Sequence, residues 1–382
     1  MWGLMITVFL FLYSLMCYYI GRRGWTILGK SASRLTRILC LIVFFLLVLP
    51  FPAAELGEDV LPGAIVPWLT IWGGYSMIAV LYGFFLLLAI DFIRLIDKWA
   101  RFIPAAVKEH KKTPPILGAA VVILVLAIVT YGGWNARNPV ITEYDVTVNK
   151  DAGSLQQLQI AMISDIHYGL IIDVERLNRL IEMMNEIKPD MVVLAGDITD
   201  GSLPSGEAGK LAEVLGQIKV PYGTYAVPGN HDRDLRDHDS ELMRHLKEAG
   251  IHVLKDNSVR IGDSLYLIGR DDPNRRSVPA RKELKDLLKG TDSSRPLILL
   301  DHQPLDLEQA QANGIDLQLS GHTHRGQIFP ANLITGLIYE QDWGLLKKEN
   351  YHLIISSGFG TWGPPLRIGN HPEVVSITLN FK

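Results

Sequence analysis

The chain has 382 residues, with 37 Lys and Arg against 40 Asp and Glu and a formal net charge of −3. This balance leaves no basic surplus for general nucleic-acid binding, so we expect no nucleic-acid partner. Cys17 and Cys40 are its two cysteines, which excludes a disulfide framework beyond residue 40.

The first third of the chain is dominated by long uncharged stretches. Four of them are about as long as the roughly 20 residues that a helix needs to cross a bilayer, at residues 2–20, 38–54, 65–90 and 116–134. We therefore predict a transmembrane region of about four helices over residues 1–134 and a separate water-soluble domain over residues 135–382.

The loops between these stretches differ in charge, and this predicts an orientation. The first and third loops are basic, and the second holds only the acidic residues Glu55, Glu58 and Asp59. Basic loops stay in the cytoplasm, so four spans would make a multi-pass protein of the cell membrane with an extracytoplasmic domain. Asp91, near the end of the third stretch, is either an interfacial charge or part of a transport path.

Residues 135–382 alternate strand and helix patterns. We expect a first strand over 141–148 and further strands at 264–269 and 352–358. Helical patterns cover 174–187, 207–218, 240–249, 280–288 and 305–313, and Asp173 is placed to cap the first of them. This alternation predicts an α/β domain of mixed sheets flanked by helices.

Polar blocks follow five short apolar runs that we expect to be buried strands. They hold seven candidate metal ligands, namely Asp165, His167, Asp197, Asn230, His302, His322 and His324. Ligands gather at the carboxyl ends of strands in open α/β sheets, so these blocks should converge. Carboxylate, imidazole and amide oxygen together suit two divalent ions. Mn, Fe, Zn and Co all fit this set, and the lone Asp197 suits a bridge between the ions.

The five ordered blocks resemble the calcineurin-like metallophosphoesterase superfamily from Leu158 to the C-terminus. The stretch GRDD at 269–272 and the tail from SGFGTWGPPL onward resemble its membrane-anchored bacterial branch. The resemblance implies a four-layer α/β/β/α sandwich, and thus a metallophosphoesterase catalytic domain over residues 135–382. It implies one ion on Asp165, His167, Asp197 and His324, and a second on Asp197, Asn230, His302 and His322. By the same resemblance His231 is the proton donor and Asp200 orients it, whereas Arg325 departs from the Gly of many members.

We accordingly predict a membrane-anchored hydrolase of phosphoric esters that acts by in-line attack of a metal-bridging hydroxide. The substrate would be a phosphodiester, pyrophosphate or phosphomonoester, and the predicted location favours a cell-envelope or lipid-linked one, with membrane lipid as a further partner. The alternatives are a non-catalytic scaffold of the same fold and a membrane sensor. The apolar stretch 332–350 either meets the membrane or an acyl chain, or forms a buried lid.

Overall fold

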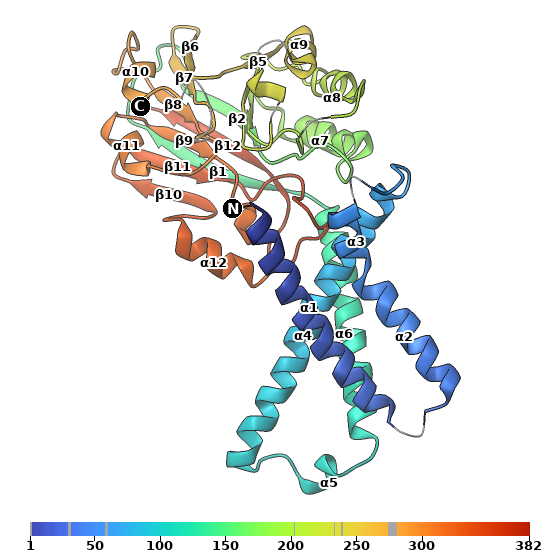
Figure 1. Cartoon of the computed structure of the whole chain (residues 1–382). Coiled ribbons are helices and arrows are strands. Elements are labelled where there is room, and N and C mark those ends of the chain that lie inside the picture. Colours follow the sequence, from blue (N-terminus) through green and yellow to red (C-terminus); the bar gives the residue numbers. More distant parts are fainter. Residues whose placement is uncertain are drawn as a thin grey trace. The chain divides into compact units, whose positions relative to one another are not determined.

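The computed structural model describes residues 2–29, 32–57, 60–201, 203–232, 234–237, 240–273 and 281–382. The chain divides into two compact units (Figure 1). The helical unit comprises Met1–Gly133 and the short segment Gly363–Leu366, and the α/β unit comprises Trp134–Trp362 and Arg367–Lys382.

The helical unit carries the apolar stretches of the sequence. Its helices are α1 (Trp2–Leu28), α2 (Arg34–Val48), α3 (Pro50–Gly57), α4 (Val66–Ala100), α5 (Ala105–Lys108) and α6 (Thr113–Ala136). Among the described residues, α4 and α6 are long and apolar enough to cross a membrane, and α2 with α3 makes a third if the pair forms one span. The first predicted span lies within α1, part of whose side chains fall outside the described residues. The number of four spans therefore stays a prediction.

Proline explains why the second predicted span is broken. The axes of α2 and α3 meet at 42°, and Pro50 begins α3. A proline ring carries no backbone N–H and crowds the preceding turn, which kinks a continuous helix. At the far end of α4, Asp91 pairs with Arg23 of α1 and lies 3.7 Å from Arg94. These partners favour the interfacial interpretation of Asp91.

The α/β unit contains two six-stranded sheets. The first has the order β1-β12-β2-β3-β4-β5 and the second the order β10-β11-β9-β8-β7-β6. The first sheet consists of β1 (Val140–Val148), β2 (Gln157–Ile163), β3 (Met191–Ala195), β4 (Thr224–Val227), β5 (Ile251–Val253) and β12 (Glu373–Phe381). The second consists of β6 (Asn257–Ile261), β7 (Leu265–Gly269), β8 (Leu297–Leu300), β9 (Leu317–Ser320), β10 (Gly344–Lys348) and β11 (Tyr351–Ile355).

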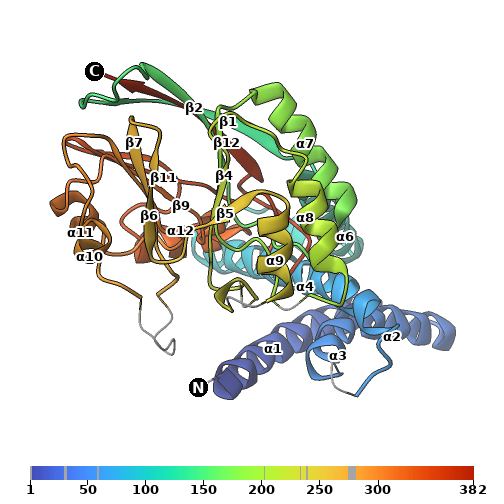
Figure 2. The same cartoon turned by 90° about the horizontal axis from the view of Figure 1, so that it is seen from above.

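Three apolar cores separate four layers. The side chains of both sheets meet in one core that includes Ile160, Val193 and Leu319. A second core lies under α7 (Val174–Ile187), α8 (Glu207–Leu215) and α9 (Glu241–Glu248), and a third under α10 (Leu284–Leu287) and α11 (Leu307–Ala312). Figure 2 shows these two helix layers on opposite sides of the paired sheets. The predicted α/β/β/α sandwich is confirmed.

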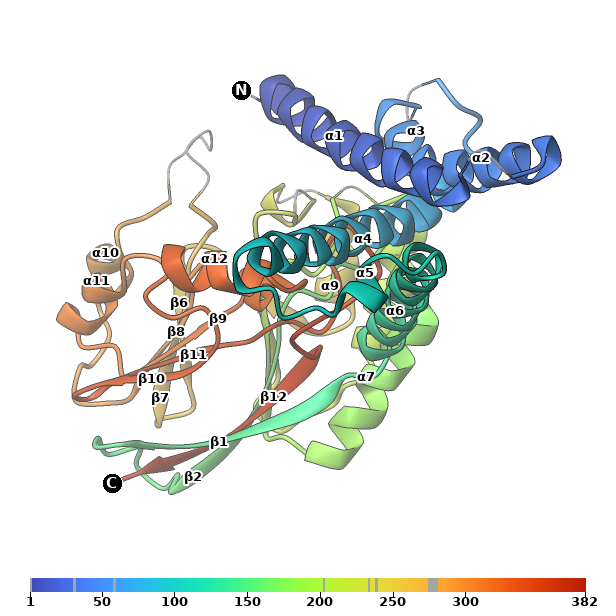
Figure 3. The same cartoon turned by 90° about the horizontal axis from the view of Figure 1, so that it is seen from below.

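The two ends of the α/β unit are tied together. Strand β1 pairs in parallel with β12 along its whole length, as Figure 3 shows, and β12 pairs antiparallel with β2. The predicted first strand is thus confirmed. Just before it, the Asn135 side chain at the end of α6 donates hydrogen bonds to the carbonyls of Arg367 (2.9 Å) and Asn370 (2.7 Å). The end of α6 is therefore fixed inside the α/β unit.

The stretch 332–350 is not one structural element. Helix α12 (Ala331–Ile338) has no buried residue, so the buried-lid interpretation is wrong for it. Trp343 differs, because its Nε1 donates to the buried Glu373 carboxylate at 2.9 Å and its ring lies 4.1 Å from the Arg325 guanidinium carbon. Trp343 is half-buried and held by these two partners, so it does not share the exposed surface of α12.

Candidate metal centre

The seven predicted ligands follow strands of both sheets. Asp165 and His167 follow β2, Asp197 follows β3, and Asn230 follows β4 in the first sheet; His302 follows β8, and His322 and His324 follow β9 in the second. In the first sheet β3 pairs in parallel with both β2 and β4, and in the second sheet β8 pairs in parallel with β9. Their carboxyl ends therefore meet at one edge of the sandwich.

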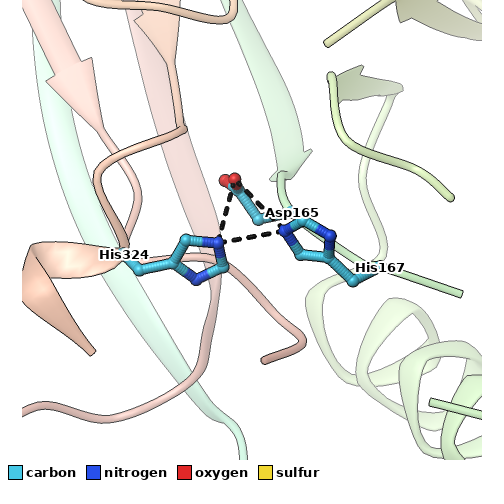
Figure 4. Close-up of side chains that lie close together, drawn as sticks. All are labelled: Asp165, His167 and His324. Carbon is cyan, nitrogen blue, oxygen red and sulfur yellow. Dashed lines mark hydrogen bonds and ion pairs between the residues drawn. The ribbon is translucent and has the colours of Figure 1, made fainter. Parts of the chain in front are cut away.

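One group of ligands consists of Asp165, His167 and His324 (Figure 4). The two Nε2 atoms of the histidines lie 3.0 Å apart, and Asp165 Oδ1 lies 3.4 Å from His324 Nε2 and 4.0 Å from His167 Nε2. All three residues are buried. Two imidazole nitrogens and a carboxylate oxygen thus point at one small volume, which is the donor set that a divalent cation needs.

A second group surrounds Asp197. The Asp197 Oδ2 atom lies 3.2 Å from His302 Nε2, and Asn230 Oδ1 lies 3.2 Å from the same nitrogen. His322 completes the group, since one ligand atom from each of Asp197, His302 and His322 lies within 4.8 Å of the others. Asp197 Oδ2 is also 3.8 Å from His167 Nε2 of the first group. Asp197 therefore stands between the two groups, as a shared ligand must.

His231 and Asp200 lie at the open side of this arrangement. His231 Nδ1 is 3.5 Å from Asp200 Oδ1, and the His231 side chain is 28% exposed, whereas the candidate ligand His302 is fully buried. The His231 ring centroid lies 5.0 Å from that of His167. His231 is thus next to the ligands and still open to solvent, which a group that exchanges protons with a substrate requires.

The backbone of the ligand loops is unusual. Asp165, His167, Asp197, His322 and His324 all have positive φ, between 47° and 73°. Side chains other than glycine rarely adopt this left-handed conformation, and it concentrates at functional sites where the surroundings enforce it. Backbone hydrogen bonds do so here: His167 N donates to Asp197 O, and Asp165 N donates to Gly196 O, each at 3.0 Å. The two loops therefore hold each other in shape.

The groups around the ligands orient them. His302 Nδ1 donates to the Ala195 carbonyl at 2.8 Å, which leaves Nε2 with its lone pair toward Asp197. His322 N donates to both Asp165 oxygens at 3.0 and 3.1 Å, and His231 N donates to Asp197 Oδ1 at 2.8 Å. The carboxylates therefore have fixed positions before any cation binds.

The carboxylates and imidazoles of the centre shift one another's protonation in both directions. Burial lowers the pKa of His302, but Asp197 outweighs it and raises that pKa to about 10. Burial also lowers the pKa of His167, but Asp200 and Asp197 outweigh it and raise that pKa. Burial, reinforced by the nearby His302, lowers the pKa of His322 to about 4, and burial together with His167 and Arg367 lowers the pKa of His324. Burial opposes ionisation of Asp197, but His302 and His167 outweigh it and lower the pKa of Asp197. The donor atoms of these carboxylates and imidazoles are of the types that bind divalent cations, and a cation would take the place of the protons on His302 and His167.

Two further buried residues support the centre and were not predicted as site residues. Asp232 accepts hydrogen bonds at 2.8 Å from Thr199 N and Gly229 N, which joins the Asp197 loop to the Asn230 loop. Burial and the charge of Asp197 together raise the pKa of Asp232 to about 6. The sequence signal for a role of Asp232 in the site is its position in the block GNHD, two residues after the candidate ligand Asn230.

Arg367 is the other such residue, and it is fully buried. Its guanidinium donates to the carbonyls of Gly358 (3.0 Å) and Gly360 (2.6 Å) and lies 3.2 Å from His324 Nδ1. It thereby joins the C-terminal tail to a candidate ligand. The tail is a motif in the sequence, but a single arginine in a loop carries no local pattern that marks it as buried.

The GRDD stretch also has a structural role. Arg270 Nη1 lies 3.1 Å from the buried Asp301 carboxylate, and Arg281 binds the same carboxylate at 3.1 Å. The Gln303 side chain donates to Asp272 at 2.7 Å. These contacts flank His302 on both sides and fix its loop.

Comparison with known proteins gives consistent matches. The calcineurin-like phosphoesterase family matches residues 158–326. A transmembrane protein with a metallophosphoesterase domain from Danio rerio is 34% identical over 274 residues, which cover 68% of this chain and 62% of that protein. An uncharacterized metallophosphoesterase from Aquifex aeolicus is 33% identical over 59% of this chain and 86% of its own length. One from Campylobacter jejuni is 30% identical over 81% of this chain and 82% of its own. The aligned region thus spans about three fifths of the zebrafish relative and most of the two bacterial ones.

Proposed function

We propose that this chain, which belongs to the calcineurin-like phosphoesterase family, is a membrane-anchored hydrolase of phosphoric esters that depends on two divalent metal ions. The observation that carries the proposal is the position of Asp197 between two groups of buried ligands. Asp165, His167, Asp197 and His324 would hold one ion, and Asp197, Asn230, His302 and His322 the other. When bound, such a pair polarises a phosphoryl group and activates the attacking water.

The chain's own residues supply the remaining steps. His231 faces the ligands from the solvent side, where it donates a proton to the departing oxygen of the ester. Burial lowers the pKa of His231, and the charges of Asp197 and Asp200 partly offset that effect. Asp200, 3.5 Å away, thus favours the protonated ring and orients Nδ1. Asp232 and Arg367 keep the ligand loops in place.

A non-catalytic scaffold is less well supported than an enzyme. A scaffold has no need for a solvent-facing histidine beside a complete ligand set, and here all seven ligands, His231 and Asp200 lie together. A sensor would require functional polar groups in the helices. Asp91 is the candidate for such a polar group. Its carboxylate is paired with Arg23 and lies near Arg94, which supports a structural role instead.

The substrate class follows from location. Helices able to cross a membrane precede the α/β unit, and the basic first and third loops support an extracytoplasmic position for that unit. We therefore propose a cell-envelope or lipid-linked phosphate as substrate. Manganese, iron, zinc and cobalt all match the donor set.

The test is a metal-reconstitution assay on the purified full-length chain. After chelation, hydrolysis of p-nitrophenyl phosphate and bis-p-nitrophenyl phosphate should be lost and should return with added Mn²⁺, Fe²⁺, Zn²⁺ or Co²⁺. Asp197→Asn should abolish hydrolysis and reduce the content of both ions, because one weakened ligand serves two coordination shells. Asp263→Asn, which changes a carboxylate that is 93% exposed, is the matched control and should bind two ions. Asp197→Asn protein with two ions and full activity would refute the shared-ligand assignment.

A further inference from the structure

Helix α12 exposes the side that soluble proteins bury. Its sequence ANLITGLI holds no charged residue, and none of its residues is buried. Leu333, Ile334, Leu337 and Ile338 recur at a helical spacing that places them on one side, and they are 58%, 58%, 88% and 67% exposed. We call these four residues the apolar face. Figure 1 shows α12 outside the two helix layers of the sandwich.

The apolar face is fixed to the candidate metal centre. Thr335 of α12 donates a hydrogen bond to Asp342 Oδ2 at 2.6 Å, and Thr323 of the GHTHR loop donates to the Asp342 carbonyl at 2.6 Å. Tyr339, directly after α12, packs edge-on against the His322 ring with 6.2 Å between centroids. A molecule that touches the apolar face is therefore held beside the loop that carries His322.

A second exposed apolar group flanks the proposed proton donor. Trp362 is 53% exposed, and its ring centroid lies 6.0 Å from that of His231. The Gln327 side chain holds the Trp362 backbone through both its atoms, donating to the carbonyl at 3.0 Å and accepting from the N–H at 2.9 Å. The centre thus has apolar surface beside both His322 and His231.

The chain itself indicates which environment meets this surface. Helix α6, long and apolar enough to cross a membrane, ends at Ala136, and β1 begins at Val140. Asn135 is bonded into the α/β unit, and the residues between Ala136 and Val140 span at most roughly 15 Å. A bilayer crossed by α6 would therefore lie next to the unit. The strength with which a helix binds at the surface of such a bilayer scales with the apolar area that it buries there.

We infer that the apolar face of α12 docks on the lipid bilayer and holds the metal centre at phosphate groups carried by membrane lipids. The docking on the bilayer is independent of the proposed phosphoesterase function. The second half of the inference, action on lipid-borne phosphate groups, rests on that function. Docking removes four aliphatic side chains from water, which favours the membrane-bound position. It also places lipid-borne esters within reach of His231 without a diffusional search in bulk water.

The test reads membrane contact directly. In the full-length chain with Cys17 and Cys40 replaced, a single cysteine at Leu337 is labelled with a polarity-sensitive nitrobenzoxadiazole dye, and the protein is reconstituted into vesicles of phosphatidylethanolamine and phosphatidylglycerol. The emission at position 337 should shift to the blue and be quenched by lipids with a nitroxide on the acyl chain. A dye at Glu182 on α7, which is 65% exposed, should show neither effect.

A kinetic arm tests the second half. Changing Leu337 and Ile338 to Ser should raise the apparent KM for phosphatidic acid in these vesicles at least about tenfold relative to the KM for p-nitrophenyl phosphate. Changing both to Met, which keeps the face apolar, should preserve the ratio.

The possible failures are distinct. A dye at 337 that stays in water while p-nitrophenyl phosphate is hydrolysed overturns the docking surface and leaves the proposed function intact. A quenched dye without metal-dependent hydrolysis of either ester overturns the function and leaves the docking surface. A dye at 337 that shifts to the blue and is shielded from aqueous iodide in vesicles, yet is not quenched by the nitroxide lipids, indicates a protein partner and overturns the lipid assignment.

Discussion

His231 lies where it can protonate the leaving group of the substrate. Its contribution to kcat should therefore depend on how much the leaving group needs a proton. A general acid typically accelerates a reaction about 10²–10⁴-fold, so His231→Ala should reduce kcat by this order for an alkyl phosphate ester. The loss should shrink for p-nitrophenyl esters, whose leaving group departs without a proton. Asp200→Asn should give a smaller loss of the same kind, because Asp200 acts through His231.

Two controls separate this role from a metal-binding role. The metal content of His231→Ala should equal that of the wild type, since His231 is absent from both proposed ligand sets. Equal losses for the alkyl and the p-nitrophenyl ester would contradict the proton-donor assignment.

Arg367 provides a residue-scale prediction about stability. Arg367→Met keeps the length of the side chain but leaves the Gly360 carbonyl without its buried donor, whereas the Gly358 carbonyl keeps the hydrogen bond from Glu373 N. An unpaired buried polar group costs about 1–3 kcal/mol, so the variant should lose about that much unfolding free energy and melt at a lower temperature. Arg295→Met, which breaks a pair with the 74% exposed Asp151, should cost less than about 1 kcal/mol. Equal melting temperatures for the two variants would contradict the structural role of Arg367.

At the scale of elements, the packing of loops around the centre sets the next prediction. A Cβ atom on Gly360 would lie 2.7 Å from the Ile166 carbonyl carbon and 2.9 Å from the Asp165 carbonyl oxygen. Both are backbone atoms of a ligand loop, which must therefore move. Gly360→Ala should lower metal content and activity together. A fully active Gly360→Ala protein would show that the loops tolerate a shift.

Gly336 of α12 is the matched control for Gly360. A Cβ atom there meets nothing within 4 Å, and alanine is favoured over glycine inside a helix by up to about 1 kcal/mol. Gly336→Ala should therefore leave metal content unchanged and should not lower the melting temperature.

The elements that the sequence predicts best are those with a capped, one-sided apolar pattern. Helix α7 spans 174–187 as expected, and Asp173 caps it by accepting a hydrogen bond from Arg176 N at 3.1 Å. The helix expected at 280–288 is shorter, since α10 covers only Leu284–Leu287 and residue 280 lies outside the described residues. Four residues between turns carry too little periodicity to define an end.

The candidate site was largely predictable because each ligand sits in a short local motif at the end of a strand. Its supporting contacts were not, because Arg367 contacts His324, 43 residues away, and Asp301 pairs with Arg270 and Arg281, 31 and 20 residues away. The split of 332–350 was equally hidden: Leu337 and Trp343 look alike in an apolar list, and only the buried Glu373 draws the indole of Trp343 inward.

At the scale of the whole molecule, the orientation in the membrane is the main prediction. Single cysteines near Arg236 and at Lys112, in a background without Cys17 and Cys40, can be exposed to a membrane-impermeant thiol reagent on intact cells. The position near Arg236 should react and position 112 should not, because basic loops stay inside. Reaction at 112 alone would invert the topology.

The strand order of the first sheet also bears on how the protein is made. Strand β12 lies between β1 and β2, yet it follows all the other strands in the chain. The apolar helices are therefore synthesised well before β12. While the chain is still on the ribosome, the place of β12 between β1 and β2 in the first sheet is empty. Until β12 arrives, β1 lacks its partner and β2 presents an open edge of unpaired N–H and C=O groups. Prematurely terminated chains would keep that open edge, which makes them natural targets for proteolysis at the membrane.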